Sequence, residues 1–228
     1  MRHLLHTMMG GVVVAGLSVG LGLVSPTATA HGKSQAGSSH RAHIVPADRA
    51  DGRTGSQLLA ETWTHIYRIH TSEPQPNCSY AGRTDHVLIA GSAAEVCRVK
   101  RGYPVMYFFG STCDPISPEP WYAVGRREQR RCALKFDRSF IVGMHLRVDH
   151  GRNLNLRRAR FELFTGQRHV VVPVDNIWGE AAGPTTFTAH AWGAFVEHLA
   201  LGEHTTVLTS DFSDGSRNVE TRTIRVIH

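Results

Sequence analysis

Four cysteines are the residues of this 228-residue chain whose spacing says most about its chemistry: Cys78, Cys97, Cys113 and Cys132. No C-x-x-C pair occurs among them, so the motif of a thioredoxin-type redox centre is absent. The gaps are also too wide for the paired ligands of a zinc site. An even number of widely spaced cysteines predicts two disulfides and an oxidising compartment.

Four cysteines allow three disulfide pairings, and we favour the two bonds Cys78–Cys97 and Cys113–Cys132. Each bond would close a loop of about 20 residues and contribute on the order of 3 kcal/mol through loop entropy. The run between Cys97 and Cys113 would then be a buried strand that carries one half of each bond.

Histidine is abundant, with 15 residues, but its spacing predicts little metal chemistry. Zinc needs three or four converging ligands, and neither H-x-H nor H-E-x-x-H occurs. His190 and His204 are the weak candidates, because both fall on predicted strands that could face each other across a sheet. We expect packed or surface histidines, no catalytic residue, no metal and no cofactor, and we keep a hydrolase or metalloenzyme built on these histidines as the alternative.

Exposed side chains on loops offer a softer functional hypothesis. Trp121, Tyr122 and Trp178 lie on predicted loops, where aromatic rings suit sugar stacking or protein recognition. Asp175 and Asn176 follow a proline in an extended segment and could join a ligand site. The competing interpretations are rings that cover the ends of the sandwich and a turn held by Asx side chains.

The N-terminus reads as an export signal. Arg2 precedes an apolar run, Val12 to Val24, and Ala28-Thr29-Ala30 fits the small-x-small cleavage rule. We therefore expect a signal peptide over 1–30, a disordered leader over 31–50 and one secreted domain over 51–228. The apolar run is short for a membrane span, so no stable transmembrane segment is expected after cleavage.

The formal net charge is +6, and basic residues are dense only in "RREQRR" (126–131) and "LRRAR" (156–160). We interpret both runs as solvated faces and expect no specific nucleic-acid binding. General electrostatics leaves room for weak attraction to anionic wall polymers or lipid headgroups.

The hydrophobic pattern predicts a helix over 55–69, capped by Thr54 or Ser56. A helix or helical turn is expected over 119–134, inside an insertion. Short alternating or apolar runs bounded by glycine, proline and Asp-Gly turns predict strands over most of the rest. Two of these runs, 185–192 and 193–199, are read as separate strands. The fold class is therefore mainly β, an antiparallel sandwich that is Ig-like or jelly-roll-like, with an N-terminal helix and a helical insertion.

The order of these landmarks resembles a family of uncharacterised secreted bacterial proteins. The matching stretches are "AETWTHIY" (60–67), "PNC" (76–78), "VLIAG" (87–91), "CRVKRGYPVMYFFG" (97–110), "CDPISPEPWYAVGRREQRRC" (113–132), "RVDHGRNL" (147–154), "VPVDN" (172–176), "WGAFVEHL" (192–199) and "LGEHT" (201–205). The chain departs from the pattern in its helix, where only Trp63 remains of two or three tryptophans. It also departs where His150 separates Asp149 from Gly151. The resemblance implies a β-sandwich with the favoured disulfide pairing and carries no activity.

Together these features predict a secreted, non-catalytic domain that binds an extracellular glycan, an envelope component or a protein. A structural component of the envelope is the second alternative to an enzyme.

Overall fold

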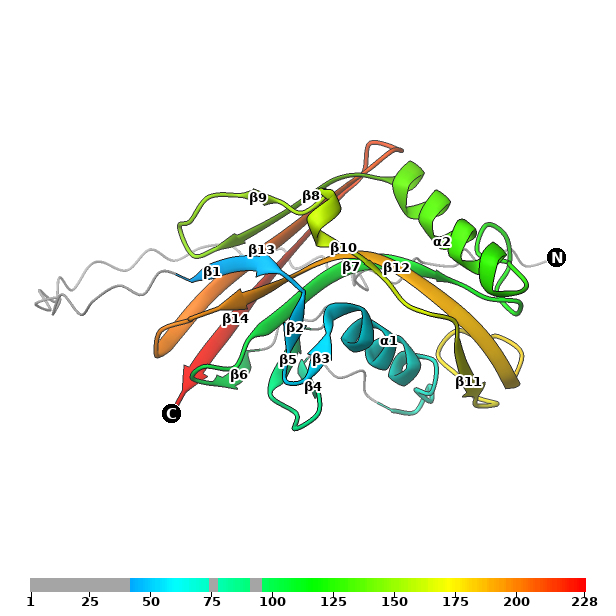
Figure 1. Cartoon of the computed structure of the whole chain (residues 1–228), viewed down its shortest axis with the longest axis horizontal. Helices are drawn as coiled ribbons and strands as arrows, with labels where there is room; N and C mark the ends of the chain where they lie inside the picture. Colours follow the sequence, from blue (N-terminus) through cyan, green and yellow to red (C-terminus); the bar gives the residue numbers. More distant parts are fainter. Residues whose placement is uncertain (1–41, 74–77, 91–95) are drawn as a thin grey trace, which may run out of the picture.

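The computed structural model describes residues 42–73, 78–90 and 96–228, which form a mainly β protein with two main sheets and two helices (Figure 1). The sandwich-like class expected from the sequence is confirmed. Two strand pairs, β5–β7 and β6–β14, are parallel, so the sheets are not purely antiparallel as predicted. The predicted signal peptide and the leader up to residue 41 lie outside the described residues.

The first sheet is built around β12 (Gly183–Glu197), which pairs antiparallel with β7 (Val105–Cys113). Beyond β7 lie β5 (Val87–Ala90) and β4 (Cys78–Ala81). The other side of β12 pairs with three short strands, β1 (His43–Pro46), β10 (Glu162–Phe164) and β11 (Arg168–Val172).

The second sheet has five strands in the order β6 (Cys97–Lys100), β14 (Arg217–Ile227), β13 (Gly202–Phe212), β8 (Ile141–Val148) and β9 (Leu154–Asn155). Thr206, Leu208 and Ser210 of β13 are buried while the residues between them are not, as the two-residue alternation predicts. A small ladder of β2 (Arg49–Ala50) and β3 (Arg53–Thr54) lies outside both sheets, and a 3-10 turn, η1 (Ala159–Phe161), precedes β10.

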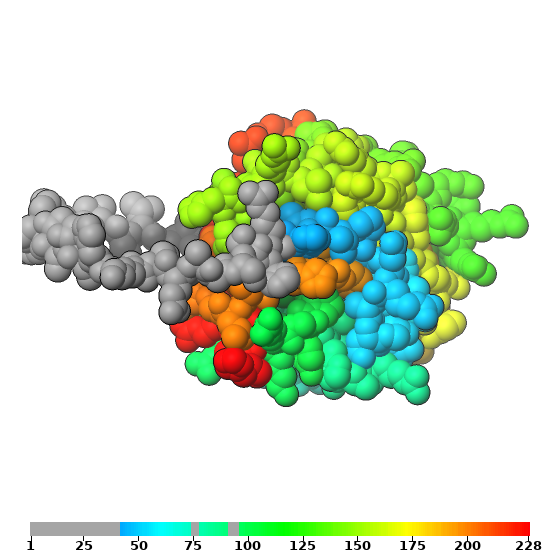
Figure 2. Space-filling view, turned by 60° about the vertical axis from the view of Figure 1, so that its left-hand side comes forward, coloured from blue at the N-terminus to red at the C-terminus, as the bar shows by residue number. Residues whose placement is uncertain are grey.

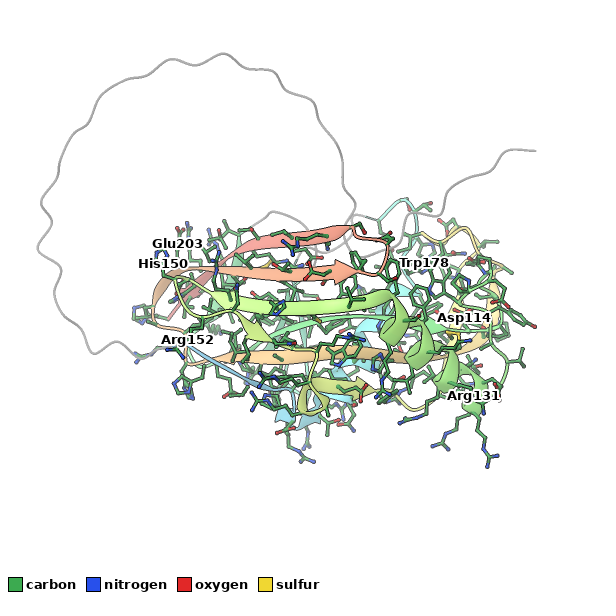
Figure 3. The ribbon with its side chains drawn as sticks, turned by 90° about the horizontal axis from the view of Figure 1, so that it is seen from above. Asp114, Arg131, His150, Arg152, Trp178 and Glu203 are labelled. Atoms are coloured by element: carbon green, nitrogen blue, oxygen red, sulfur yellow. A yellow bond between two sulfur atoms is a disulfide. The ribbon has the colours of Figure 1, made fainter. Side chains whose placement is uncertain are left out.

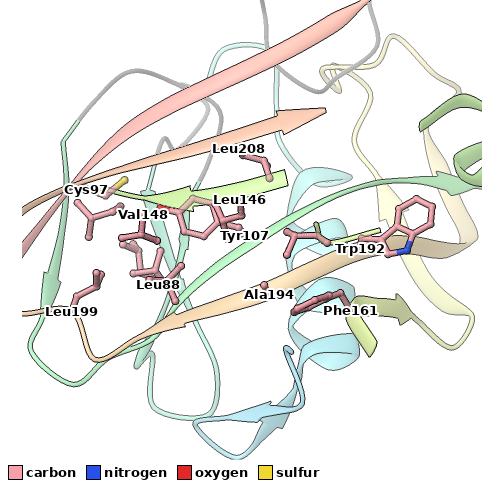
Figure 4. Packing of buried hydrophobic residues seen from close by; sticks show 14 of the residues in the cluster. Leu88, Cys97, Tyr107, Leu146, Val148, Phe161, Trp192, Ala194, Leu199 and Leu208 are labelled. Atoms are coloured by element: carbon pink, nitrogen blue, oxygen red, sulfur yellow. The ribbon is translucent and has the colours of Figure 1, made fainter. Parts of the chain in front are cut away.

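The core between the two sheets is formed by one face of each. Tyr107, Trp192 and Ala194 of the first sheet pack against Leu146 and Leu208 of the second (Figure 4). Each large apolar side chain that is removed from water here contributes roughly 1.5–3 kcal/mol.

Helix α1 (Gly55–Ile66) covers the opposite face of the first sheet. Its start follows from a capping box, in which Thr54 Oγ1 accepts from the Gln57 N–H and Gln57 Oε1 accepts from the Thr54 N–H. Leu58, Leu59 and Trp63 are buried against the sheet. The helix ends three residues earlier than predicted.

Helix α2 (Arg126–Phe140) lies on the same face of β12 as the second sheet, beyond the point where the two sheets diverge (Figure 1). The residues of β12 that point to this face therefore fall into two groups. Those within 192–196 pack against the second sheet, and those within 186–190 face α2. The predicted range, 119–134, is wrong at both ends, because a loop runs to Gly125 and the helix continues to Phe140.

Two further predictions, one about the leader and one about the strands, need correction. The leader assigned to 31–50 includes β1, which pairs with the end of β12 and lies on the surface beside the yellow-green residues around 150 (Figure 2). The runs 185–192 and 193–197 belong to one strand, β12, which is buried on both faces. Gly193 does not interrupt the strand; a Cβ there would lie 2.7 Å from the Leu163 side chain.

Both disulfides are present with the favoured pairing, Cys78–Cys97 and Cys113–Cys132. The first joins β4 of one sheet to β6 of the other, and the second joins the end of β7 to α2. Two disulfides are consistent with an oxidising compartment. Within the described ranges, no helix is long and apolar enough to cross a membrane.

Candidate functional site

A cavity of about 200 Å³ lies where the first turns of α2 meet the β10–β11 connection and β12. We call it the α2 pocket. It is lined by Arg126, Arg130, Phe164, Thr165, Gly166, Gln167 and Thr188. These residues come from three separate parts of the chain, so the pocket exists only because β10 pairs with β12 beneath the helix.

Helix α2 supplies a strongly basic wall. It carries six basic residues and two acidic ones, and Arg131 projects from it away from the body of the protein (Figure 3). Glu128 pairs with Arg131, and Asp137 is buried, so neither acid neutralises the pocket. The helix N-terminus at Arg126 has no side-chain cap, and its dipole adds to the positive potential.

A buried polar network holds the C-terminal half of α2 on the sheet. His190 Nδ1 lies 2.7 Å from Asp137 Oδ2, and His190 Nε2 lies 3.1 Å from Glu162 Oε1. Glu162 in turn accepts from the Arg138 guanidinium at 2.9 Å. The network thus links α2, β10 and β12, the three elements that supply the walls of the pocket.

Burial dominates the electrostatics of this network. It raises the pKa of Asp137, and the hydrogen bond from His190 only partly opposes that change. Asp137 Oδ2 also accepts from the Ser111 N–H, while Asp137 Oδ1 and Ser111 Oγ are buried with no hydrogen-bond partner. A carboxylate that is fixed this deeply serves to position α2, since His190 and Asp137 are both removed from solvent.

The N-terminal half of α2 is held by Gln129, a fully buried residue. Its Nε2 donates to the carbonyl oxygen of Thr186 at 3.0 Å and to Thr186 Oγ1 at 2.9 Å. Its Oε1 accepts from Gln167 Nε2 at 2.9 Å. The helix, β12 and the turn after β10 are therefore joined directly beside the pocket.

The guanidinium of Arg130 is placed by an aromatic ring. Its central carbon lies 3.9 Å from the centroid of Phe164, which fits a cation–π contact. Such a contact uses the flat face of the guanidinium and leaves the N–H groups at its edge available. Among the described residues, no carboxylate pairs with Arg126 or Arg130.

The chemistry of this arrangement is anion binding. Two guanidinium groups at i and i+4 line one small cavity, and guanidinium edges match carboxylate and phosphate oxygens in bidentate fashion. The volume is below the roughly 300 Å³ at which typical small-molecule sites begin, so the cavity suits one acidic group or one small unit of a larger ligand.

The aromatic residues predicted to bind ligand lie apart from this pocket. Trp121 packs on Phe136 of α2, with ring centroids 5.3 Å apart, and on the cluster around the Cys113–Cys132 bond. Tyr122 is exposed on the loop that precedes α2. Of these two rings, the structure leaves Tyr122 more accessible to a partner.

The other predicted cluster, around 175–178, organises a loop. Trp178 stacks on Trp63 of α1 at 6.4 Å, and Asn176 is buried and bonds to the backbone of Pro173, Trp178 and Glu180. Asp175 is exposed, and its Oδ1 lies 2.5 Å from His70 Nδ1. Trp178 lies at the same end of the molecule as Asp114 and Arg131 (Figure 3).

The two histidines kept as weak metal candidates do not meet. His190 lies on β12 in the first sheet, and His204 lies on β13 in the second, where its Nδ1 is 2.8 Å from Asp149 Oδ2. Across the part of the chain that the structure describes, no group of three or more His, Cys, Asp or Glu residues could hold a metal ion.

Sequence reasoning identified none of the seven residues that line the pocket. The dense run at 126–131 was a usable signal, but we interpreted it as a solvated face. The turn at 166–167 carries no motif, so its place beside the helix follows only from the pairing of β10 and β11 with β12.

The fold and the pocket define a disulfide-bonded, two-sheet β protein with a cationic cavity beneath its second helix. Comparison of the chain with protein-family models, with curated proteins and with solved structures gives no match.

Proposed function

We propose that this chain is an exported binding protein, without catalysis, that holds an acidic group of an extracellular ligand in the α2 pocket. Export, and kinship with the secreted bacterial proteins that the sequence resembles, are parts of this proposal. The two disulfides support it, because such bonds persist in oxidising compartments.

The observation that carries the proposal concerns the charge partners of Arg126 and Arg130. Both line the cavity, and no carboxylate among the described residues pairs with either of them. By contrast, Arg131 and Arg138 on the same helix each have an acidic partner. An acidic ligand would complete the pairing that the fold leaves open at the pocket.

The rigidity of the site supports binding. The pocket walls are joined by the Cys113–Cys132 bond, by Gln129 and by the Asp137–His190 pair. Walls that are fixed before the ligand arrives reduce the ordering cost of association.

The test is a titration of the purified protein with small acids and their neutral parents, followed by backbone amide NMR shifts. The panel is glucuronate with glucose, galacturonate with galactose, and glycerol 3-phosphate with glycerol. We expect at least one acid to shift amides of 126–130 and 164–167, and no neutral parent to do so at the same concentration.

The variant for this test is Arg126→Gln combined with Arg130→Gln, and the matched control is Arg127→Gln, on the same helix outside the pocket lining. We expect the double variant to lose at least tenfold in affinity and the control to lose less than threefold. Binding of no acid, or equal binding by the double variant, would overturn the proposal.

A further inference from the structure

The orientation of the Gln167 side chain is fixed by its neighbours. Gln129 uses its Nε2 to donate to the Thr186 carbonyl and hydroxyl oxygens, so its Oε1 must accept. That oxygen accepts from Gln167 Nε2 at 2.9 Å, and Gln167 Nε2 also lies 3.3 Å from Thr186 Oγ1. The nitrogen end of Gln167 is therefore turned toward Gln129 and is committed there.

The oxygen end of Gln167 is left as a hydrogen-bond acceptor on the pocket lining. Within the described part of the chain, no donor reaches Gln167 Oε1, and that atom is not among the buried polar atoms that lack a partner. It is therefore not fully buried, and it belongs to a side chain that lines the cavity. The pocket thus combines an acceptor with the donors of Arg126 and Arg130.

This combination distinguishes between kinds of acid. An ionised carboxylate accepts hydrogen bonds and donates none, so a bare acid would use the guanidiniums and leave Gln167 Oε1 unused. A ligand that also carries a hydroxyl near its acidic group would use all three. A site built to accept from a hydroxyl discriminates against an analogue that lacks it.

We propose that the α2 pocket binds a hydroxylated acid, namely an acidic sugar unit whose carboxylate contacts Arg126 and Arg130 and whose adjacent hydroxyl donates to Gln167 Oε1. This rests on the proposed function and specifies its ligand. The cavity volume of about 200 Å³ suits a single sugar unit, and a Cβ at Gly166, which lines the cavity, would meet no atom within 4 Å.

The test compares three probes of similar size on the intact protein by calorimetry and NMR: glucuronate, cyclohexanecarboxylate and glucose. Glucuronate has the charge and the hydroxyls, cyclohexanecarboxylate has only the charge, and glucose has only the hydroxyls. We expect glucuronate to bind about tenfold more tightly than cyclohexanecarboxylate, as one well-made hydrogen bond allows, and glucose to bind least.

A Gln167→Met variant extends the comparison from the ligand to the protein. It removes the Oε1 acceptor and also the bond from Nε2 to Gln129, so the readout is the ratio of the two affinities on the variant, which should fall from about ten to about one. The thermal midpoint reports whether the variant folds. A second variant, Gly166→Leu, adds a large side chain to the pocket lining without a clash at its Cβ and should block both acids.

The outcomes separate the two proposals. Equal binding of glucuronate and cyclohexanecarboxylate, both lost in the Arg126→Gln and Arg130→Gln double variant, would overturn the sugar inference and keep the acid-binding function. If glycerol 3-phosphate binds more tightly than glucuronate, the hydroxylated acid is a phosphorylated polyol, and the sugar inference is overturned. Failure of every acid would overturn both.

Discussion

His190 and Asp137 form a fully buried pair, with Nδ1 2.7 Å from Oδ2, that joins the centre of β12 to α2. Gly110 of β7 makes this possible, because a Cβ there would lie 2.1 Å from the His190 carbonyl oxygen. The pair therefore depends on close contact between β7 and β12 as well as on the helix. Its position makes it a structural anchor for one wall of the α2 pocket.

Replacement of Asp137 by alanine should destabilise the protein by about 3–5 kcal/mol, because it leaves the buried His190 Nδ1 and the Ser111 N–H without their partner. Urea unfolding with both disulfides intact measures this. Lys135→Ala, an exposed change on the same helix, should stay within about 0.5 kcal/mol of the parent. Similar midpoints for the two variants would contradict an anchoring role.

The two disulfides should differ in their effect on binding although they close loops of equal length, with a sequence separation of 19 in each. Serine replacement of either pair should cost about 3 kcal/mol of unfolding free energy. Only the loss of Cys113–Cys132, which ties α2 to β7, should also weaken binding of acids to the pocket. Parallel titrations of the two double variants, at a temperature where both are folded, check this, and equal affinities would count against it.

Two glycines offer a matched pair for packing. Gly110→Ala places a methyl group against the backbone of His190 and Ala191, and should cost more than about 2 kcal/mol, since the strands must separate. Gly166→Ala meets open space at a backbone angle that other residues adopt, and should change stability little. Thermal unfolding compares the two; a tolerated Gly110→Ala would show that β7 and β12 are not closely fixed.

Alkaline pH should weaken the core through Tyr107. Burial raises the pKa of its phenol to about 12, against an ordinary value of 10.0, while Thr206 Oγ1 lies 2.6 Å from its oxygen. The unfolded chain then loses the proton first, so stability is present below pH 10 and is lost as pH rises toward about 12. The Tyr107→Phe variant lacks this loss, so its deficit at neutral pH should shrink by about 2 kcal/mol over that range. A constant difference between parent and variant would refute the assignment.

The sequence predicted the strands whose two faces differ, and it failed where both faces are covered. In β13, Thr206 and Leu208 are buried and alternate with less buried neighbours, so the two-residue period was readable. In β12 every residue from 187 to 196 is buried, and Gly193 looked like a boundary. The correct reading requires knowledge of α1 on one side and of α2 and the second sheet on the other.

Helix α2 shows the same limit for polar residues. Asp137 lies beyond the predicted end of the helix at 134, and the partner of its Oδ2 atom, His190, lies 53 positions away. The candidate site could not be predicted for the same reason. Arg126 and Arg130 are adjacent on the helix by spacing alone, whereas their approach to Gln167 depends on the pairing of β10 and β11 with β12.

The pairing of β12 and of β14 with strands from much earlier in the chain also has a kinetic consequence. β12 pairs with β1 near the start of the domain, and β14 pairs in parallel with β6, so that Ile224 meets Cys97. Contacts between such distant residues raise the contact order, and proteins rich in them fold in milliseconds to seconds instead of microseconds. The first sheet cannot be completed until β12 has been synthesised, and the second not until the final strand, β14, so the chain acquires its native topology only as a whole.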